Sequence, residues 1–381
     1  MEQLFITNLT IRNVRHLKDI SIPLSGEKIK HLILTGKNGS GKTSVVEAMA
    51  EYLNNAFTQT RFHVKSTLLK RDLQIQFNNT NIDVAVWSEE YHHILAYYKA
   101  GRVFQAEQPK HVEKVQLKDY YGLQEFPRNE FVKYLLDLKM TEALARNNKK
   151  TEKADEIQIW FEKLEELLKQ IFEDETIELT FDEDTFEFHI SQKGKEPFDF
   201  NTLSSGYQAV LDIVVDIMMR MQHQTQRSFD FNLPGIVLID EIETHLHLEL
   251  QKAIVPLLTT IFPNIQFIMT THSPFILNSL ENVVIYDLEN HLLVENGLDN
   301  IPYDGIVEGY FGADKLSNIL KEKFERYKNL IGKAELSDDE LNEIAELELY
   351  LDEIPDYLAI GIATEYERLK LEFMNREDID G

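Results

Sequence analysis

Hydrophobic and polar positions alternate along the first part of the chain, and this pattern predicts short strands. Apolar runs at residues 4–6, 9–11 and 20–22 are separated by polar turns, as in a β-hairpin or a meander. The run at residues 31–35 is mostly apolar and predicts a buried strand, which a helix over residues 43–52 follows.

The rest of the chain switches between strand-like and helix-like spacing. Residues 73–98 alternate again and predict an antiparallel sheet. Between residues 129 and 172 the apolar side chains recur every three or four positions, which predicts two helices of about 18 and 20 residues. Alternation at residues 177–190 predicts a hairpin. Beyond residue 310 the pattern is helical, and residues 337–340 form a capping box before one of these helices.

The composition indicates one large α/β domain with an insertion or appendage, because 381 residues with 43% hydrophobic content can bury a sizeable core. The absence of cysteine excludes a disulfide framework, a zinc finger, an iron–sulfur cluster and a thiol nucleophile. The sequence shows neither a long apolar run nor a signal peptide. We therefore expect a soluble, cytoplasmic protein with no membrane partner.

The net charge of −26 argues against a protein that holds nucleic acid unaided, because Lys and Arg dominate affinity for phosphate backbones. Basic clusters occur at residues 65–71 and 146–153, and solvated helix faces explain both. Any contact with nucleic acid is therefore expected to be local or to be made through a partner.

Residues 36–43 read GKNGSGKT and match the pattern GxxxxGK[ST] without a mismatch. The loop stands between a predicted strand and a predicted helix, where glycines let backbone N–H groups wrap a phosphate. We predict a nucleotide phosphate site, with Lys42 on the β- and γ-phosphates and Thr43 on Mg²⁺. A glycine-rich turn that binds nothing is the alternative. The expected nucleotide contacts are Gly36, Asn38, Gly39, Ser40, Gly41, Lys42, Thr43 and Ser44.

Residues 235–241 form an aliphatic run that ends in Asp240 and Glu241. This pattern predicts a buried central strand with two carboxylates at its C-terminal end. Ligands of open α/β sheets collect at such ends, so we expect the carboxylates beside the glycine-rich loop. Asp240 would hold the water shell of Mg²⁺, and Glu241 would take a proton from the attacking water.

Two further segments place polar groups at the ends of predicted elements. Residues 202–208 precede an apolar helix, where hydroxyl groups and a glycine make an anion site, although a plain helix cap uses the same residue types. His272 follows a predicted buried strand, and a neutral imidazole there would contact the γ-phosphate or the attacking water. A structural histidine is the alternative. The expected ligand contacts of the first segment are Ser204, Ser205, Gly206 and Gln208.

The order of these motifs resembles that of the ABC-class ATPase heads of the SMC and RecF-like superfamily, over about residues 1–295. The resemblance implies that residues 203–208 are the signature motif, residues 243–247 the D-loop and His272 the switch histidine. It also implies that Arg15 lies on the nucleotide side. Such heads sandwich ATP and Mg²⁺ between the P-loop of one protomer and the signature of a second, so the resemblance implies a head-to-head dimer or a higher oligomer.

Thr-His-Ser-Pro at residues 271–274 and Glu-Thr-His-Leu-His at residues 243–247 resemble bacterial anti-phage defence ATPases. These include Septu, retron-associated, anticodon-nuclease-associated and overcoming-lysogenization-type members. The resemblance implies an ATPase that controls a separate effector such as a nuclease, because no nuclease constellation is visible in the chain. The alternatives are a RecF/SMC-like ATPase of DNA repair, which the charge disfavours, and a transporter motor, which would need a membrane partner.

The chain departs from the family pattern at two points. His247 occupies the position of the usual D-loop Asp; metal binding by His245 and His247 is an alternative to D-loop packing. The Q-loop glutamine has no clear candidate. Residues 97–102 stand where this loop is expected and could replace it, and the candidate glutamines are Gln74, Gln76 and Gln105.

These observations together predict an α/β fold: a P-loop NTPase head of the ABC type with an antiparallel β-subdomain, a short helical insertion and a C-terminal helical region. Residues 1–127 are expected to hold the first part of the head with the P-loop, and residues 128–173 the helical insertion. Residues 174–300 complete the head with signature, acidic strand end and switch histidine. Residues 301–381 are expected to be helical and to dock a partner.

Overall fold

The computed structural model describes most of the chain, and it divides into two compact units, Met1–Tyr303 and Asp304–Gly381. The segment boundaries predicted above stay predictions. The basic cluster at residues 65–71 and the strand-like run at residues 82–86 lie outside the described residues. The described residues are 3–58, 72–79, 92–102, 104–299, 301, 305–306, 318–333, 336–352 and 360–374.

The first unit is built on a six-stranded sheet with the order β11-β10-β3-β9-β8-β5. All neighbouring pairs are parallel except β10 and β11. The central strands consist of buried side chains throughout, as expected for a parallel sheet with both faces covered. The strands are β3 (His31–Thr35), β5 (Ile94–Tyr98), β8 (Gly235–Ile239), β9 (Ile265–Thr270), β10 (Val283–Asp287) and β11 (Leu292–Val294).

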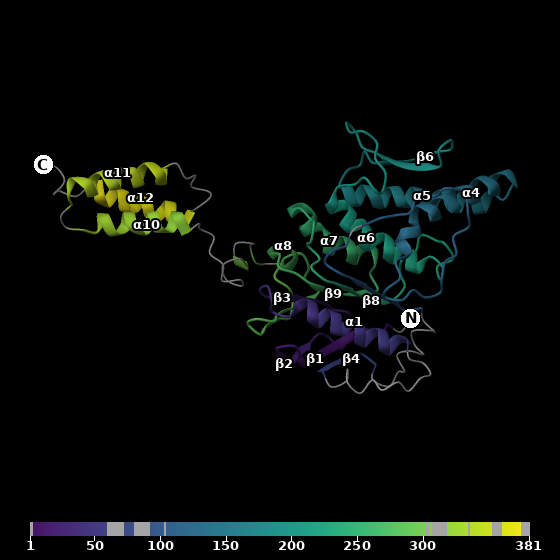
Figure 1. The fold of residues 1–381 in the computed structure, drawn as a ribbon, viewed down its shortest axis with the longest axis horizontal. Helices are drawn as coiled ribbons and strands as arrows, with labels where there is room; N and C mark the ends of the chain where they lie inside the picture. The colour runs from purple at the N-terminus through teal and green to yellow at the C-terminus, as the bar shows by residue number, and fades with distance from the viewer. Residues whose placement is uncertain are drawn as a thin grey trace. The chain divides into compact units, whose positions relative to one another are not determined.

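Helices cover both faces of this sheet. Helix α1 (Lys42–Thr58) lies on one side of β8 and β9, and α6 (Ser205–Met221) and α7 (Leu248–Ile261) lie on the other (Figure 1). A short helix α8 (Pro274–Leu277) follows β9 directly. The P-loop connects β3 to α1, so the predicted strand–loop–helix order is confirmed.

A second, antiparallel sheet packs on the α1 side and shares one hydrophobic core with α1 and the main sheet. Its order is β2-β1-β4. The buried side chain of Gln266 on β9 links the two sheets: it accepts from Ile6 N at 2.7 Å and donates to Ile6 O at 3.0 Å. The strands are β1 (Ile6–Val14), β2 (Leu17–Pro23) and β4 (Leu73–Phe77).

The prediction of one antiparallel sheet over residues 73–98 is right for β4 and wrong for β5. Strand β4 pairs antiparallel with β1, whereas β5 pairs parallel with β8 at the edge of the main sheet. The physical reason lies in the sequence of β5, Ile-Leu-Ala-Tyr-Tyr, which is a continuous apolar run and not an alternating one. Such a run is typical of a strand packed on both faces.

The helical insertion and the hairpin after it are confirmed. Helices α4 and α5 are 17 and 22 residues long and pack against each other. Trp160 of α5 makes edge-to-face contacts with the rings of Tyr134, Phe161 and Phe229. The elements are η1 (Pro127–Glu130), α4 (Phe131–Asn147), α5 (Thr151–Phe172), β6 (Glu178–Asp182) and β7 (Glu187–Ser191).

The second unit is helical, as predicted, and has its own core around the buried Tyr327. Helices α10 (Asn318–Ile331), α11 (Asp338–Asp352) and α12 (Ile360–Met374) contribute to this core. The predicted capping box is confirmed: Glu340 accepts a hydrogen bond from the N–H of Ser337 at 3.0 Å, and Ser337 Oγ accepts from Glu340 N at 3.4 Å. Within the described ranges, no helix is long and apolar enough to cross a membrane.

The buried residue His31 lowers the stability of the first unit at acidic pH. Its Nδ1 atom accepts a hydrogen bond from Phe267 N at 3.1 Å, and burial lowers its pKa from 6.5 to about 4. Because the folded-state pKa lies below the unfolded value, protonation favours the unfolded chain. Stability is therefore complete above pH 6.5 and is lost as the pH falls toward 4. We expect His31 to account for a loss of about 3 kcal/mol in the free energy of unfolding over this interval.

Urea unfolding of wild type and His31→Gln at several pH values measures this loss. The variant can accept from Phe267 N but cannot titrate, so its free energy of unfolding should fall less between pH 6.5 and 4. His111→Gln, at an exposed position, is the control and should retain the wild-type slope. A wild-type slope in His31→Gln would contradict the prediction.

Candidate functional site

The loop between β3 and α1 depends on its glycines. Gly36, Gly39 and Gly41 have positive φ values of 130°, 86° and 98°. A Cβ atom at Gly36 would lie 2.8 Å from Ser40 Oγ, and one at Gly41 would lie 2.9 Å from Leu17 Cδ1. The loop therefore closes tightly under the β1–β2 turn only with glycine at both of these positions.

The same loop provides donors for an anion. Val45 N bonds to Gly41 O at 3.0 Å, so the N–H groups at the start of α1 precede the first full helical turn and lack intrahelical acceptors. The positive end of the helix dipole adds to them. Ser40 Oγ is buried and has no hydrogen-bond partner within the described part of the chain. These groups fit the oxygens of a phosphate.

Lys42 lies beneath the loop. Its Nζ atom donates to Gly36 O at 2.7 Å and to Lys37 O at 3.1 Å. Burial lowers the pKa of Lys42, and the nearby carboxylates, with Glu241 first among them, oppose this shift. The ammonium group therefore stands between the loop and the acidic end of β8, where it can bind a phosphate oxygen as a point charge.

The acidic strand end meets the P-loop helix at Asp240. Thr43 Oγ1 donates to Asp240 Oδ1 at 3.2 Å although the two residues are 197 positions apart in the sequence. Thr270 Oγ1, at the end of β9, donates to the same oxygen at 2.7 Å and accepts from Glu241 N at 2.7 Å. The predicted proximity of the carboxylates to the loop is thus confirmed, whereas their roles stay predictions.

The residues at Asp240 fit Mg²⁺. This ion prefers oxygen ligands and is usually held by one or two carboxylates together with substrate phosphates and water. Thr43 and Asp240 supply such oxygens next to the phosphate cradle. No cluster of three His, Cys, Asp or Glu residues suited to a metal occurs among the residues that the structure describes, so a closed all-protein cage is absent there. His245 and His247 belong to no such cluster.

Backbone strain and a buried arginine shape the turn after Asp240. Glu241 has φ of 46°, which is unfavourable for a residue with a side chain and is common at functional sites. The buried guanidinium of Arg102 donates to three successive carbonyls of this turn, at 3.1 Å to Asp240 O, 3.3 Å to Glu241 O and 2.8 Å to Ile242 O. Arg102 therefore fixes the direction in which the turn leaves β8.

His272 follows β9 and lies near the carboxylates that follow β8. Its backbone N–H donates to Glu243 Oε1 at 2.5 Å. Burial and then the charge of Lys42 lower the pKa of the His272 imidazole, so the neutral form predominates at neutral pH. A neutral imidazole has one donor and one acceptor nitrogen, which suits a contact with a phosphate or with water.

The predicted signature segment begins α6 and packs against the predicted D-loop. Ser204 is the N-cap residue, and Ser204 and Ser205 are exposed. A Cβ atom at Gly206 would lie 3.2 Å from His245 O, so glycine allows this close approach. The ring of Tyr207 contacts that of His247 edge to face, with centroids 6.2 Å apart.

Gln208 serves the local structure of this segment, because its Nε2 atom donates to Asn201 O at 2.9 Å. Across the described ranges, no hydrogen bond or ion pair joins residues 204–208 to residues 36–44. The structure of one chain therefore does not bring the predicted signature residues together with the P-loop residues.

Arg15 lies at the β1–β2 turn with φ of 54° and is exposed. The next residue, His16, lines a cavity of about 480 Å³ together with Lys37, Asn38 and Ser40 of the P-loop. The turn that carries Arg15 thus lies beside the loop, but it is His16 that faces the cavity. Sequence reasoning missed His16, and no signal in its surroundings marks it.

The candidate residues for the Q-loop lie in different parts of the fold. Gln74 and Gln76 lie on β4 in the antiparallel sheet, and Gln74 accepts from Arg12 at 2.9 Å. Gln105 is exposed. Residues 97–102, in contrast, form the end of β5 and the turn after it, and Arg102 binds them to the acidic turn. The assignment of this segment as the equivalent loop stays a prediction.

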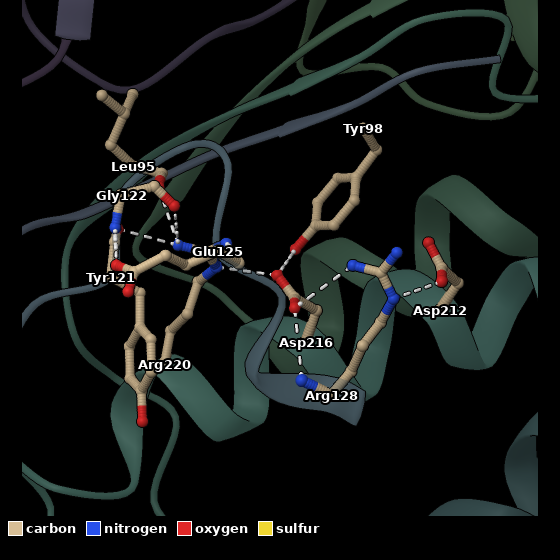
Figure 2. Close-up of polar contacts among 9 residues, drawn as sticks. All are labelled: Leu95, Tyr98, Tyr121, Gly122, Glu125, Arg128, Asp212, Asp216 and Arg220. Carbon is tan, nitrogen blue, oxygen red and sulfur yellow. Dashed lines mark hydrogen bonds and ion pairs between the residues drawn. The ribbon is translucent and has the colours of Figure 1, made fainter. Parts of the chain in front are cut away.

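A buried ionic network ties α6 to the sheet edge (Figure 2). Asp216 accepts from Tyr98 Oη at 2.8 Å and from Arg220 Nε at 2.7 Å, and Arg128 pairs with both Asp216 and Asp212. The remaining donors of Arg220 bind four backbone carbonyls, which belong to Leu95, Tyr121, Gly122 and Glu125. The helix that begins with the predicted signature segment is therefore held to β5 through charged hydrogen bonds.

The chain matches a known protein family. Residues 32–278 match a family model described as "AAA domain, putative AbiEii toxin, Type IV TA system". The chain belongs to this family. The matched residues include the P-loop, the acidic strand end and His272.

The curated relatives described here are bacterial proteins. The chain is 26% identical over 393 residues to the Septu protein PtuA of Bacillus mycoides (strain KBAB4), covering 94% of this chain and 52% of that protein. It is 35% identical over 138 residues to the Retron Ec83 probable ATPase of Escherichia coli, covering 34% of this chain and 25% of that protein. The chain thus spans about half or less of these relatives. The predicted resemblance to Septu and retron-associated ATPases is confirmed.

Among solved structures, an SMC head bound to the C-winged helix domain of ScpA matches 78% of this chain and 98% of that chain, with 14% identity and a TM-score of 0.41. A similarity this low supports no further statement about this chain. The predicted fold class is confirmed by the topology described above, in which a P-loop leads from a parallel sheet into α1 beside an antiparallel sheet.

Thr270 was not predicted as a site residue, and its replacement tests its part in the site. Thr270→Val keeps the shape of the side chain but removes the donor to Asp240 and the acceptor for Glu241 N. We expect the free energy of unfolding to fall by about 1–3 kcal/mol, because these buried groups lose their partners. Thr259→Val is the matched control, since Thr259 Oγ1 only donates back to carbonyls of its own helix. Equal losses in the two variants in a denaturant titration would contradict the prediction.

Proposed function

We propose that this protein binds ATP with Mg²⁺ and hydrolyses it. The observation that carries the proposal is the hydrogen bond of 3.2 Å between Thr43 at the start of α1 and Asp240 at the end of β8. It supports the proposal because it joins a phosphate cradle and an acidic strand end into one site. Lys42, held at this junction by loop carbonyls, is the third element.

The proposed reaction divides its tasks among these side chains. The P-loop N–H groups and Lys42 bind the β- and γ-phosphates, and Thr43 and Asp240 hold Mg²⁺, which neutralises phosphate charge when bound. Glu241 takes the proton of the attacking water, since its carboxylate follows the metal-binding position. The neutral imidazole of His272 contacts the γ-phosphate or that water.

We further propose that the active form is a head-to-head dimer or a higher oligomer built from such pairs. Two observations support this proposal: Ser204 and Ser205 are exposed at the N-terminus of α6, and nothing within the described part of one chain connects them to the P-loop. A helix N-terminus with free hydroxyl groups attracts the γ-phosphate bound to a second copy. Each copy would then complete the other's site.

For the biological role, we propose an ATPase subunit of a bacterial anti-phage system that acts in the cytoplasm and controls a separate effector, such as a nuclease. The Septu and retron relatives support this assignment. Residues 304–381 form a compact unit of their own and are proposed to dock the effector. The RecF/SMC-like repair function is the second candidate, and the charge of −26 disfavours it because DNA binding requires phosphate neutralisation.

Replacement of Glu241 tests catalysis and dimerisation together. Glu241→Gln removes the base but leaves Lys42, Thr43 and Asp240 in place, so we expect ATP binding to persist, turnover to fall at least about 100-fold and a dimer to accumulate. Size-exclusion chromatography with and without ATP and Mg²⁺ shows the dimer, and phosphate release reports the turnover. A variant that stays monomeric with ATP would contradict the nucleotide-gated dimer, and unchanged turnover would contradict the base.

Replacement of Lys42 tests the role in defence. Lys42→Ala should abolish ATP binding in a titration, and it should abolish protection when the complete native locus is expressed in cells challenged with phages. Lys37→Ala is the matched control, because Lys37 is an exposed residue of the same loop that pairs with Glu289 at 2.9 Å. Protection that is equal in wild type and Lys42→Ala would contradict a nucleotide-dependent role. Sensitivity of all three strains would contradict the defence assignment itself.

A further inference from the structure

The side chains of two adjacent tyrosines at the end of β5 lie on opposite faces of the sheet. Tyr98 points to α6, where its hydroxyl donates to Asp216 (Figure 2). Tyr97 packs on the other side, against the core that contains residues of α1 and Leu238 of β8. The ladder pairs Tyr97 with Leu238, and Asp240 N donates to Tyr98 O at 2.8 Å, so Tyr97 stands next to the acidic end of β8.

The hydroxyl of Tyr97 is buried and has no hydrogen-bond partner within the described part of the chain. Burial raises its pKa, and the charges of Asp240 and Glu47 raise it further, so the phenol keeps its proton and remains a donor near these carboxylates. A buried hydroxyl without a partner is unfavourable by about 1–3 kcal/mol. Phenylalanine would fill the same space without this cost.

The side chain of Tyr97 borders a space that admits solvent. Tyr97 lines a cavity of about 910 Å³ together with Glu47 and Glu51 of α1. Glu47 follows Thr43 by four positions, so both residues lie on the same face of the helix. The cavity thus begins one helical turn from the junction of Thr43 and Asp240. The carboxylates of Glu47 and Glu51 in its wall, together with this volume, suit ordered water.

We propose that the Tyr97 hydroxyl donates a hydrogen bond to a water molecule held at Asp240 and thereby positions the hydration of the Mg²⁺ site. This inference rests on the proposed ATPase function and adds a positioning residue to it. The sequence offers no assignable Q-loop glutamine for this site. In its place, the side chain of Tyr97, from the edge strand β5, contacts the water at the metal-binding carboxylate. The adjacent Tyr98 has a different task, because its hydroxyl is already satisfied inside the α6 network.

The pair of variants Tyr97→Phe and Tyr98→Phe, made in the full chain, separates the two tasks. The first measurement is the free energy of unfolding without nucleotide. We expect Tyr97→Phe to be as stable as wild type or more stable, and Tyr98→Phe to be less stable, because only the second loses a hydrogen bond to a carboxylate.

The second measurement is the Mg²⁺ concentration needed for half-maximal tightening of the binding of a non-hydrolysable ATP analogue. Tyr97→Phe should raise it about five- to tenfold, as expected for the loss of one hydrogen bond, and Tyr98→Phe should leave it unchanged. An unchanged requirement in Tyr97→Phe, with Mg²⁺-dependent binding in wild type, would overturn the inference and leave the proposed function standing. If wild type does not bind the analogue or ignores Mg²⁺, both the proposed function and this inference are overturned.

Discussion

The carboxylate of Asp240 is the point at which three separate segments of this chain are joined. It accepts from Thr43 at the start of α1 and from Thr270 at the end of β9, while its own strand continues into the turn that Arg102 holds. A buried charge is stable only when it is well paired and hydrogen-bonded. The C-terminal ends of β3, β9 and β8 meet at one end of the sheet because these strands are parallel neighbours, and the hydrogen bonds to Asp240 join the three segments there.

Charge is also used inside the protein, away from the proposed nucleotide site. Asp212, Asp216, Arg128 and Arg220 are all nearly or fully inaccessible to solvent, and their charges balance. Such buried pairs contribute little net stability but impose a specific geometry, because breaking one leaves an uncompensated charge. In this protein they connect α6, the helix that carries the predicted signature segment, to β5. Movement of α6 relative to the sheet would therefore require rearrangement of this network.

The sequence allowed much of the fold and part of the site to be predicted. Long apolar runs such as β8 and β9 could be read directly, because a buried strand needs such residues whatever its neighbours are. The glycine-rich loop could be read for a related reason: its positive φ values exclude other residues. Thr270 and Arg102 could not be predicted in this way. They act on a carboxylate and on backbone carbonyls that are close only in the folded chain, and a lone Thr or Arg carries no periodic signal.

The local chemistry of this protein was thus determined by its sequence. The sequence shows which residues can wrap a phosphate, which strand ends carry acid and which helices have an apolar face, since these properties depend on neighbours along the chain. The tertiary structure alone decided that β5 joins the parallel sheet, that Tyr97 and Tyr98 serve different faces, and that Thr43 and Thr270 share one oxygen of Asp240. The physical reason is that strand pairing and burial are set by contacts between distant segments, and a pattern of nearby residues holds no record of them.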